Sequence, residues 1–327
     1  MGVRILGTGS YVPEKVLSNS DLVKMVETTD EWIRKRTGIV ERRMAAPDQA
    51  SSDLALPACR GALEMAGMDK DQLDLIIMCT ITPDTHCPAG ANWLQAKLGC
   101  DRAVTFDVTA ACSGFIFGLN VAEQYLKNKT YETVLVVASE VMTRTVDYTD
   151  RSSAILWGDG AGAVILANDD RTPRILSTHI HTDGARGRNL LMPGGGSITT
   201  PISHESVDKK LHNLRMIEAA ASVKVAVRKF VESCQEAMEA NGVTVDDVAL
   251  FIPHQANLRM LQGVAKRLGV PMERLYITIQ KYGNISSASA AIAFDEAVRD
   301  GTVKKDDLIV LTAFGGGLTW GSALVEW

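Results

Sequence analysis

The sequence predicts an α/β fold made of two similar halves. Apolar runs that are typical of buried strands, such as residues 75–78 (LIIM) and 249–252 (ALFI), alternate with segments of helical periodicity. In addition, residues 62–67 (ALEMAG) are echoed by residues 237–242 (AMEANG), and each segment matches a helix end followed by a glycine cap. Strands that alternate with helices favour a layered structure with mostly parallel sheets.

A second pair of segments indicates the same duplication. Residues 131–138 (YETVLVVA) resemble residues 306–313 (DDLIVLTA), and each precedes a glycine-rich turn and a further strand. We therefore expect two halves, 1–168 and 217–327, joined by a connecting segment, 169–216. A chance likeness between two ordinary strand–helix units is the alternative explanation.

The composition favours a cytoplasmic globular enzyme over several other classes of protein. The chain has 327 residues, 46% of them hydrophobic, and it contains no apolar run of about 18 residues that could span a membrane. A net charge of −5 gives no sign of a nucleic-acid partner. The six cysteines form no CxxC pair, and the N-terminus does not resemble a secretory signal, so we expect reduced thiols.

Cys112 is the first candidate catalytic residue. It follows an expected strand, 104–108, and comes just before a segment of helical spacing that begins at Phe115. The dipole and the free N–H groups of a helix N-terminus stabilise a thiolate, which predicts a pKa below the usual value of about 8.5. The same N–H groups can stabilise an oxyanion. The alternative is a small core thiol at a tightly packed turn.

His254 and Asn284 are the candidate partners in the second half. His254 directly follows a strand and precedes an expected helix, 258–268, at the sheet edge where α/β proteins bind ligands. Asn284 precedes another expected helix, 288–298, at the place that the Cys112 turn occupies in the first half. A twofold relation between the halves would bring Asn284 close to Cys112. A surface histidine, or a core histidine with its hydrogen bonds satisfied, is the alternative for His254.

Two glycine-rich segments do not meet the requirements of a dinucleotide site. Residues 7–9 (GTG) lack the remainder of the fingerprint, and residues 158–162 lead into a strand rather than a helix. No His and Cys spacing suggests a metal site. We therefore expect neither a metal nor a cofactor.

Six segments together closely resemble the signatures of the β-ketoacyl-acyl carrier protein synthase III enzymes, a thiolase-like condensing enzyme family. They are TAACSGF, PHQAN, YGNISSAS, AFGGGLTWGSA, TTDEWIRKRTGI and WGDGAGAVIL. The likeness runs from about residue 3 to the C-terminus, and six co-linear motifs make chance improbable. The resemblance implies the five-layered α-β-α-β-α thiolase fold with two duplicated halves, and a homodimer.

The resemblance also implies the reaction. An acyl-CoA primer and malonyl-acyl carrier protein undergo a decarboxylative Claisen condensation through an acyl-Cys112 thioester, which initiates fatty acid synthesis and releases CoA and CO2. In this scheme His254 and Asn284 donate hydrogen bonds to the enolate, while the N–H groups of Cys112 and Gly316 hold the oxyanion. Acyl-CoA is then a substrate rather than a cofactor.

The binding residues are implied in the same way. The residues expected to bind CoA are Trp32, Arg36, Arg151 and Asn257. The residues expected to bind the acidic carrier protein are Arg259, Lys266 and Arg267. For the first set the alternative is a half-buried tryptophan with solvated arginines, and for the second it is a solvated helix face.

Two departures from the family pattern concern the primer. Cys87 stands where many acetyl-selective members have an aromatic residue, on the part of the acyl pocket that the resemblance assigns to the partner subunit, so we expect room for a longer acyl chain. The alternative is that other apolar side chains fill the space. Within the unusual stretch 216–224, Val223 stands near the place of a phenylalanine beside the pantetheine channel. Two alternative functions remain. One is a related enzyme of a secondary pathway with a non-acetyl primer, and the other is a non-catalytic carrier-binding module.

Overall fold

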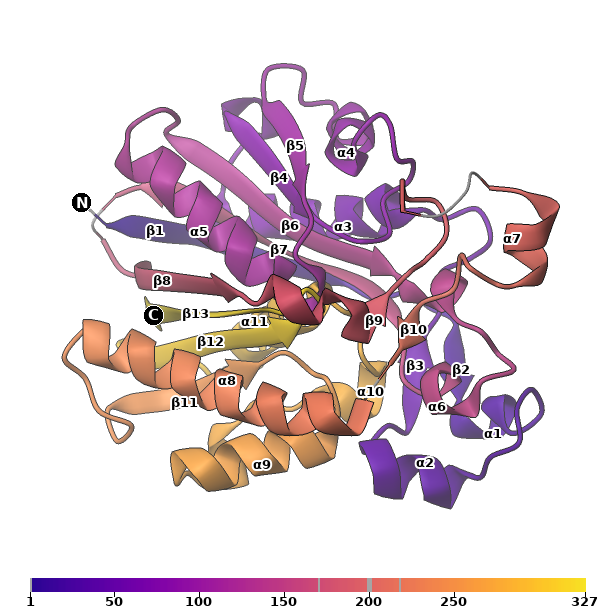
Figure 1. Ribbon diagram of the computed structural model, residues 1–327. Helices are drawn as coiled ribbons and strands as arrows, with labels where there is room; N and C mark the ends of the chain where they lie inside the picture. Colours follow the sequence, from indigo (N-terminus) through magenta and orange to yellow (C-terminus); the bar gives the residue numbers. More distant parts are fainter. Residues whose placement is uncertain (1, 170, 199–201, 218) are drawn as a thin grey trace.

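The computed structural model describes residues 2–169, 171–198, 202–217 and 219–327 (Figure 1). The largest sheet of the described residues has nine strands, and two further sheets have two strands each. The nine strands are β1 (Val3–Tyr11), β4 (Leu75–Cys79), β5 (Val104–Val108), β6 (Thr133–Val141), β7 (Asp159–Asn168), β8 (Arg174–Thr182), β11 (Val248–Pro253), β12 (Leu308–Gly315) and β13 (Thr319–Glu326). Their spatial order is β11-β12-β13-β8-β1-β7-β6-β4-β5.

Helices and strands stack in five layers, with a helical layer between the two parts of the sheet and one on each outer face, which confirms the predicted fold class. The helices are α3 (Ser51–Ala66), α4 (Gly90–Leu98), α5 (Gly114–Lys127), α8 (Ala219–Ala240), α9 (Leu258–Leu268) and α11 (Ala288–Arg299). Helices α5 and α11 contact strands of both halves and fill the central layer, while α3 with α4 and α8 with α9 cover the outer faces (Figure 1). The largest apolar cluster lies in this central layer.

The sheet is mixed, so the expectation of mostly parallel strands was wrong. Strand β4 runs parallel to β5 and β6, and β11 runs parallel to β12. Antiparallel pairs join β6 to β7, β12 to β13, β13 to β8 and β7 to β1. The glycine-rich segment between β12 and β13 is a tight turn that reverses the chain, and such a hairpin can only be antiparallel.

The two halves meet where β1 and β8 pair over two residues. Strand β8 lies inside the segment 169–216 that the sequence treats as a connection, yet it pairs with β13 along nearly all of its length. The sheet of the second half therefore includes residues that precede 217.

The glycine-rich segments noted in the sequence serve helix packing. A Cβ atom on Gly9 would lie 2.1 Å from the Ala58 oxygen of α3, and one on Gly162 would lie 2.6 Å from Ala291 of α11. These glycines let two helices lie unusually close to the sheet.

Smaller elements connect the strands and the main helices along the chain. They are β2 (Val16–Ser18), β3 (Glu41–Arg43), α1 (Asn19–Leu22), α2 (Asp30–Thr37), α6 (Arg151–Ala154), α10 (Ile279–Tyr282), β9 (Leu190–Leu191), β10 (Arg215–Met216), α7 (His204–Asp208) and the 3-10 turns η1 (Lys70–Gln72), η2 (Ala111–Ser113), η3 (Met142–Thr145), η4 (Gly184–Asn189) and η5 (Met272–Arg274). No helix in the described part of the chain is long and apolar enough to cross a membrane.

Candidate active site

Cys112 lies in the turn η2, between the end of β5 and the start of α5. The preceding residue, Ala111, has a φ of +46°, a left-handed conformation that is uncommon outside glycine. This turn brings Cys112 against the end of β12, where a Cβ atom on Gly315 would lie only 2.6 Å from the Cys112 nitrogen. Cys112 is consequently buried, with 5% of its surface exposed.

Burial raises the pKa of the Cys112 thiol to about 12. The Ser286 hydroxyl, which has no hydrogen-bond partner among the described residues, lies near the thiol and partly lowers this pKa. The nearby charge of Glu140 raises the pKa further. The prediction of a lowered pKa is therefore wrong for the free protein. Loss of hydration outweighs the helix dipole, because α5 begins only at Gly114 and the thiol is shut away from water.

His254 follows the last residue of β11 and points into the interior. Its backbone N–H donates a hydrogen bond to the Thr312 carbonyl oxygen at 2.7 Å, and the residue is 1% exposed. Among the described residues, Nδ1 of the ring has no hydrogen-bond partner. Burial lowers the pKa of His254 to about 3, with a smaller opposing effect from the Ser286 backbone. The imidazole is therefore neutral at physiological pH.

Asn284 lies in the turn before α11 and is anchored by its backbone. Its N–H donates to the Leu156 oxygen at 2.8 Å, and its own oxygen accepts from the Gly158 N–H at 3.0 Å. Its side-chain Oδ1 accepts a hydrogen bond from the Ser286 N–H at 2.9 Å. Because Oδ1 is engaged in this way, Nδ2 is the atom of the amide that remains to donate to a ligand.

Ser286, which the sequence analysis did not single out, brings the three candidate residues together. Its hydroxyl lies beside the Cys112 thiol, its backbone lies beside the His254 ring, and its N–H holds Asn284. It has a φ of +46°, and it is fully buried. The only signal in the sequence was its place in the YGNISSAS segment, since a backbone conformation and contacts across the chain cannot be read from a motif.

Gly316 lies one residue beyond the glycine that touches Cys112. A Cβ atom on Gly316 would lie 3.1 Å from the Leu190 side chain rather than against the thiol. The hydroxyl of Thr319 lies 2.9 Å from the Ala110 oxygen and 3.0 Å from the Gly316 oxygen. This hydroxyl ties the glycine-rich turn to the turn that carries Cys112.

Three of the residues expected to bind CoA form a cluster at the surface. The guanidinium carbons of Arg36 and Arg151 lie 5.2 Å and 5.0 Å from the centre of the Trp32 ring, within the range of cation–π attraction. Trp32 and Arg36 come from α2, and Arg151 begins α6. The cluster thus combines a flat aromatic surface with two groups that bind phosphate.

Asn257 and the basic residues belong to α9. Asn257 caps this helix, since its Oδ1 accepts from the Met260 N–H at 2.9 Å. Arg259, Lys266 and Arg267 are all exposed along the same helix. Helix α9 therefore begins only a few residues after His254 and carries exposed basic residues along its length.

Cys87 is exposed, and the structure does not bring it together with Cys112. It precedes a cis peptide bond to Pro88. The loop around it is held by the Thr85 hydroxyl, which donates to the Pro88 oxygen at 2.9 Å and accepts from the Trp93 indole at 3.0 Å.

The unusual stretch 216–224 leads into α8. Val223 packs against the apolar cluster that contains Phe314 and Leu318, on either side of the glycine-rich turn. Residue 218 of this stretch lies outside the described residues. Among the described residues, no group of three or more His, Cys, Asp or Glu side chains could hold a metal ion.

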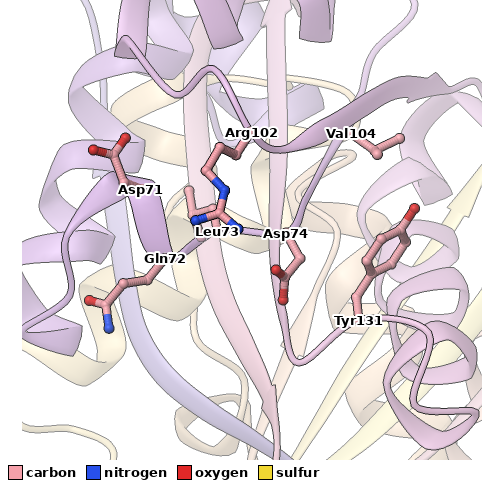
Figure 2. Close-up of a pocket in the computed structure, with 7 residues that line it drawn as sticks. All are labelled: Asp71, Gln72, Leu73, Asp74, Arg102, Val104 and Tyr131. Carbon is pink, nitrogen blue, oxygen red and sulfur yellow. The ribbon is translucent and has the colours of Figure 1, made fainter.

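A surface pocket of about 370 Å³ lies at the other end of the first half's strands (Figure 2). Its lining residues are Asp71, Gln72, Leu73, Asp74, Arg102, Val104 and Tyr131. The Asp74 carboxylate already accepts from the Glu132 and Thr133 N–H groups at 3.0 Å each. Because β4 separates this pocket from the end where Cys79 and Cys112 lie, the pocket does not belong to the candidate active site.

Two family models match the chain. One, described as 3-oxoacyl-(acyl-carrier-protein (ACP)) synthase III, matches residues 106–184, and one described as the C terminal of the same synthase matches residues 238–327. A curated β-ketoacyl-(acyl-carrier-protein) synthase III of Caldanaerobacter subterraneus is 47% identical, over 99% of this chain and 97% of its own.

Solved structures of a synthase III and of a polyketide priming ketosynthase also resemble this chain over nearly its whole length. The 3-oxoacyl-(acyl-carrier-protein) synthase III of Aquifex aeolicus is 41% identical, with a TM-score of 0.91 and full coverage of both chains. The priming β-ketosynthase of the R1128 polyketide pathway is 36% identical, with a TM-score of 0.90, over 99% of this chain and 96% of its own.

Proposed function

Since this chain belongs to the 3-oxoacyl-(acyl-carrier-protein) synthase III family, a family of condensing enzymes, we propose that it joins an acyl-CoA primer to malonyl-acyl carrier protein by decarboxylative Claisen condensation. The products are β-ketoacyl-carrier protein, CoA and CO2. The observation that supports this reaction best is the meeting of Cys112, His254 and Asn284 around Ser286. This reaction would initiate fatty acid synthesis.

In the first step Cys112 takes the acyl group. Its sulfur forms a bond to the acyl carbonyl carbon, the bond from that carbon to the CoA sulfur breaks, and the thiol proton passes to CoA. Because the thiol is protonated at rest, the neutral imidazole of His254 is suited to accept its proton as the bond forms. The N–H groups of Cys112 and Gly316 would hold the tetrahedral oxyanion.

In the second step the malonyl group loses CO2 and leaves an enolate. Hydrogen bonds from His254 and from Nδ2 of Asn284 would stabilise its oxygen, each donor being worth about 3 kcal/mol in a dry site. The enolate carbon then attacks the acyl thioester, and the Cys112 sulfur leaves and takes up a proton.

The surface residues would hold the two substrates. The Trp32 ring and the guanidinium groups of Arg36 and Arg151 suit the adenine and phosphates of CoA. Asn257 would contact the pantetheine arm. The acidic carrier would dock on a basic surface of α9 formed by Arg259, Lys266 and Arg267.

We also propose that the enzyme is a cytoplasmic homodimer paired at the edge strand β5. Within the described residues β5 has a single neighbour, β4, and Val104 at its start is 49% exposed. An uncovered edge strand invites pairing with a second chain. Trp93 beside the Cys87 loop is 41% exposed, and the same interface would cover it. Cys87 would then line the acyl pocket of the partner subunit and leave room for a primer longer than acetyl.

The test is acylation of the purified protein with acyl-CoAs from acetyl to dodecanoyl, with branched and aromatic examples. Intact mass and peptide mapping identify the acyl group retained and the residue that carries it. Acylation at Cys112 that disappears in Cys112→Ala, followed by CO2 release with malonyl-acyl carrier protein, is the expected result. No adduct from any primer would reject the proposal.

A second function is favoured by the likeness to a priming ketosynthase of a polyketide pathway. An enzyme of that kind would prefer a non-acetyl primer and a different carrier protein. Comparing turnover with the fatty acid carrier and with a polyketide carrier separates the two functions.

A further inference from the structure

Glu140 is a buried carboxyl group that the proposed mechanism does not use. It lies near the end of β6 and has no exposed surface. Its Oε2 atom accepts hydrogen bonds from the Thr80 hydroxyl at 3.1 Å, the Ile81 N–H at 3.1 Å and the Thr82 hydroxyl at 2.6 Å. Its Oε1 atom accepts one from the Ser287 hydroxyl at 2.8 Å. One carboxylate therefore joins segments from opposite halves of the chain.

The segments that Glu140 joins lead to different parts of the candidate active site. Residues 80–82 begin the loop that carries Cys87. Ser287 directly follows Ser286, the residue at which the candidate catalytic side chains meet. Ser287 also packs on the start of α5, since a Cβ atom on Gly114 would lie 3.1 Å from its own Cβ. A displacement of Glu140 would therefore shift both residues 80–82 and the turn that contains Ser286 and Ser287.

We propose that Glu140 is a positioning residue that holds the turn of Asn284 and Ser286 in place beside Cys112 and anchors residues 80–82, the start of the loop that carries Cys87. This inference rests on the proposed function, in which Cys112 carries the acyl group. Burial raises the pKa of Glu140 itself, and its negative charge, where present, raises the pKa of the Cys112 thiol.

A matched pair of variants separates the contacts of Glu140 from its charge. In Glu140→Gln the amide oxygen can accept from residues 80–82, while the amide nitrogen donates to Ser287. The Ser287 hydroxyl can then donate to the Cys79 oxygen, which lies 3.0 Å away. Glu140→Gln therefore keeps the contacts without the charge, whereas Glu140→Ala loses both.

The experiment measures two quantities in the wild-type protein and both variants. The first is the rate of CO2 release from malonyl-acyl carrier protein, which we expect to fall about 100-fold in Glu140→Ala and less than about tenfold in Glu140→Gln. The second is the rate of iodoacetamide alkylation at Cys112 at pH 8, followed by peptide mapping. In Glu140→Gln this rate rises, because removal of a negative charge beside the thiol increases the thiolate fraction. Equal losses of CO2 release in the two variants, full activity in Glu140→Ala, or an unchanged alkylation rate in Glu140→Gln would each overturn the inference.

A double-mutant cycle provides the test if Glu140→Ala does not fold. Thr82→Val and Ser287→Ala each remove one donor on opposite sides of the carboxylate. If both act through Glu140, the combined loss of CO2 release is smaller than the product of the single losses. Independent losses that multiply would reject the coupling. A wild-type protein that accepts no acyl group contradicts the proposed function instead, so the two failures are distinguishable.

Discussion

At the scale of the residue, Cys112 and His254 are both uncharged at rest, so they do not form a thiolate–imidazolium ion pair. Burial raises the pKa of Cys112 to about 12 and lowers that of His254 to about 3. Both shifts follow from the same loss of hydration, which disfavours the thiolate and the imidazolium alike. Such a site suits a reaction in which charge first appears on the substrate, as it does when a malonyl group decarboxylates.

The depressed pKa of His254 predicts an acid-sensitive fold. Between pH 6.5 and 3 the unfolded chain binds a proton on His254 that the folded chain does not, so stability falls as the pH falls through this range. His254→Gln removes this effect. From pH 7 to pH 5 we expect the wild-type protein to lose about 2 kcal/mol more unfolding free energy than the variant.

Urea titrations at both pH values measure this difference. His204, which is exposed in α7, provides the control, and His204→Gln should keep the acid sensitivity of the wild-type protein. Equal sensitivity in His254→Gln and the wild-type protein would contradict the prediction.

A substitution at Asn284 should slow decarboxylation of the malonyl group far more than acylation of Cys112. Asn284→Asp can still accept from the Ser286 N–H, but it cannot donate and it places negative charge where the enolate forms. We expect CO2 release to fall about 100-fold or more while acylation of Cys112 stays within about tenfold of wild type. Intact mass measures acylation, and trapped CO2 measures decarboxylation. A parallel fall in both rates would show that the turn, rather than the amide donor, had been damaged.

The sequence proposed these residues as candidates, but it predicted the wrong direction for the pKa shift of Cys112. Cys112 and His254 could be proposed because each follows a strand within a distinctive motif, and Asn284 because it stands in a motif just before a helix. Ser286 and Glu140 could not, since one acts through a left-handed backbone and the other through contacts between the halves. The direction of the Cys112 pKa shift depends on the close packing of Gly315, which no local pattern encodes.

At the scale of the element, each half supplies one turn–helix unit to the site, preceded by strand β5 in the first half and by helix α10 in the second. The turn before α5 contains Ala111 and the turn before α11 contains Ser286, each with a φ of +46°. In both units a tight turn delivers a polar residue to the central layer, just before the helix begins. This likeness is the structural counterpart of the duplication predicted from the sequence.

Helix α9 yields a prediction that separates capping from ligand binding at Asn257. Asn257→Ala removes the cap and should cost about 1 kcal/mol of stability, while Asn257→Asp keeps an oxygen that can cap the helix. If Asn257 also contacts the pantetheine arm, the KM for acyl-CoA rises in both variants. Thermal unfolding and steady-state kinetics measure the two effects. A raised KM in Asn257→Ala alone would assign the residue to the helix cap only.

Strand order was harder to predict than strand position. The apolar runs located β4, β6, β11 and β12 because a buried strand needs only a short hydrophobic segment. Their direction depends on the turns, and the hairpin of β12 and β13 became antiparallel through a glycine-rich turn that the sequence marked only as a turn. Strand β8 was missed, since its alternating polar residues, among them His179 and His181, hide a strand in a segment that was expected to be a connection.

At the scale of the whole molecule, Cys87 is exposed, whereas Cys112 is buried. Cys87 stands in the loop before α4, which packs on the edge strand β5, while the residues expected to bind CoA and the carrier belong to other elements, chiefly α2 and α9. A dimer paired at β5 would bring the Cys87 loop of one subunit to the acyl pocket of the other. The primer preference of each site would then depend on its partner.

Mixed dimers test this dependence directly. Homodimers of Cys87→Phe should retain acetyl transfer but lose octanoyl transfer by about tenfold or more, because the ring fills the pocket. In a mixture with Cys112→Ala, an intact Cys112 in a Cys87→Phe subunit can face the unaltered Cys87 of an inactive partner. Octanoyl acylation should therefore reappear when the two variants are unfolded and refolded together, and not when they are mixed after separate folding. Octanoyl transfer that stays absent in the co-refolded sample would place Cys87 in the pocket of its own subunit, and unchanged octanoyl transfer in the Cys87→Phe homodimer would remove Cys87 from the pocket altogether.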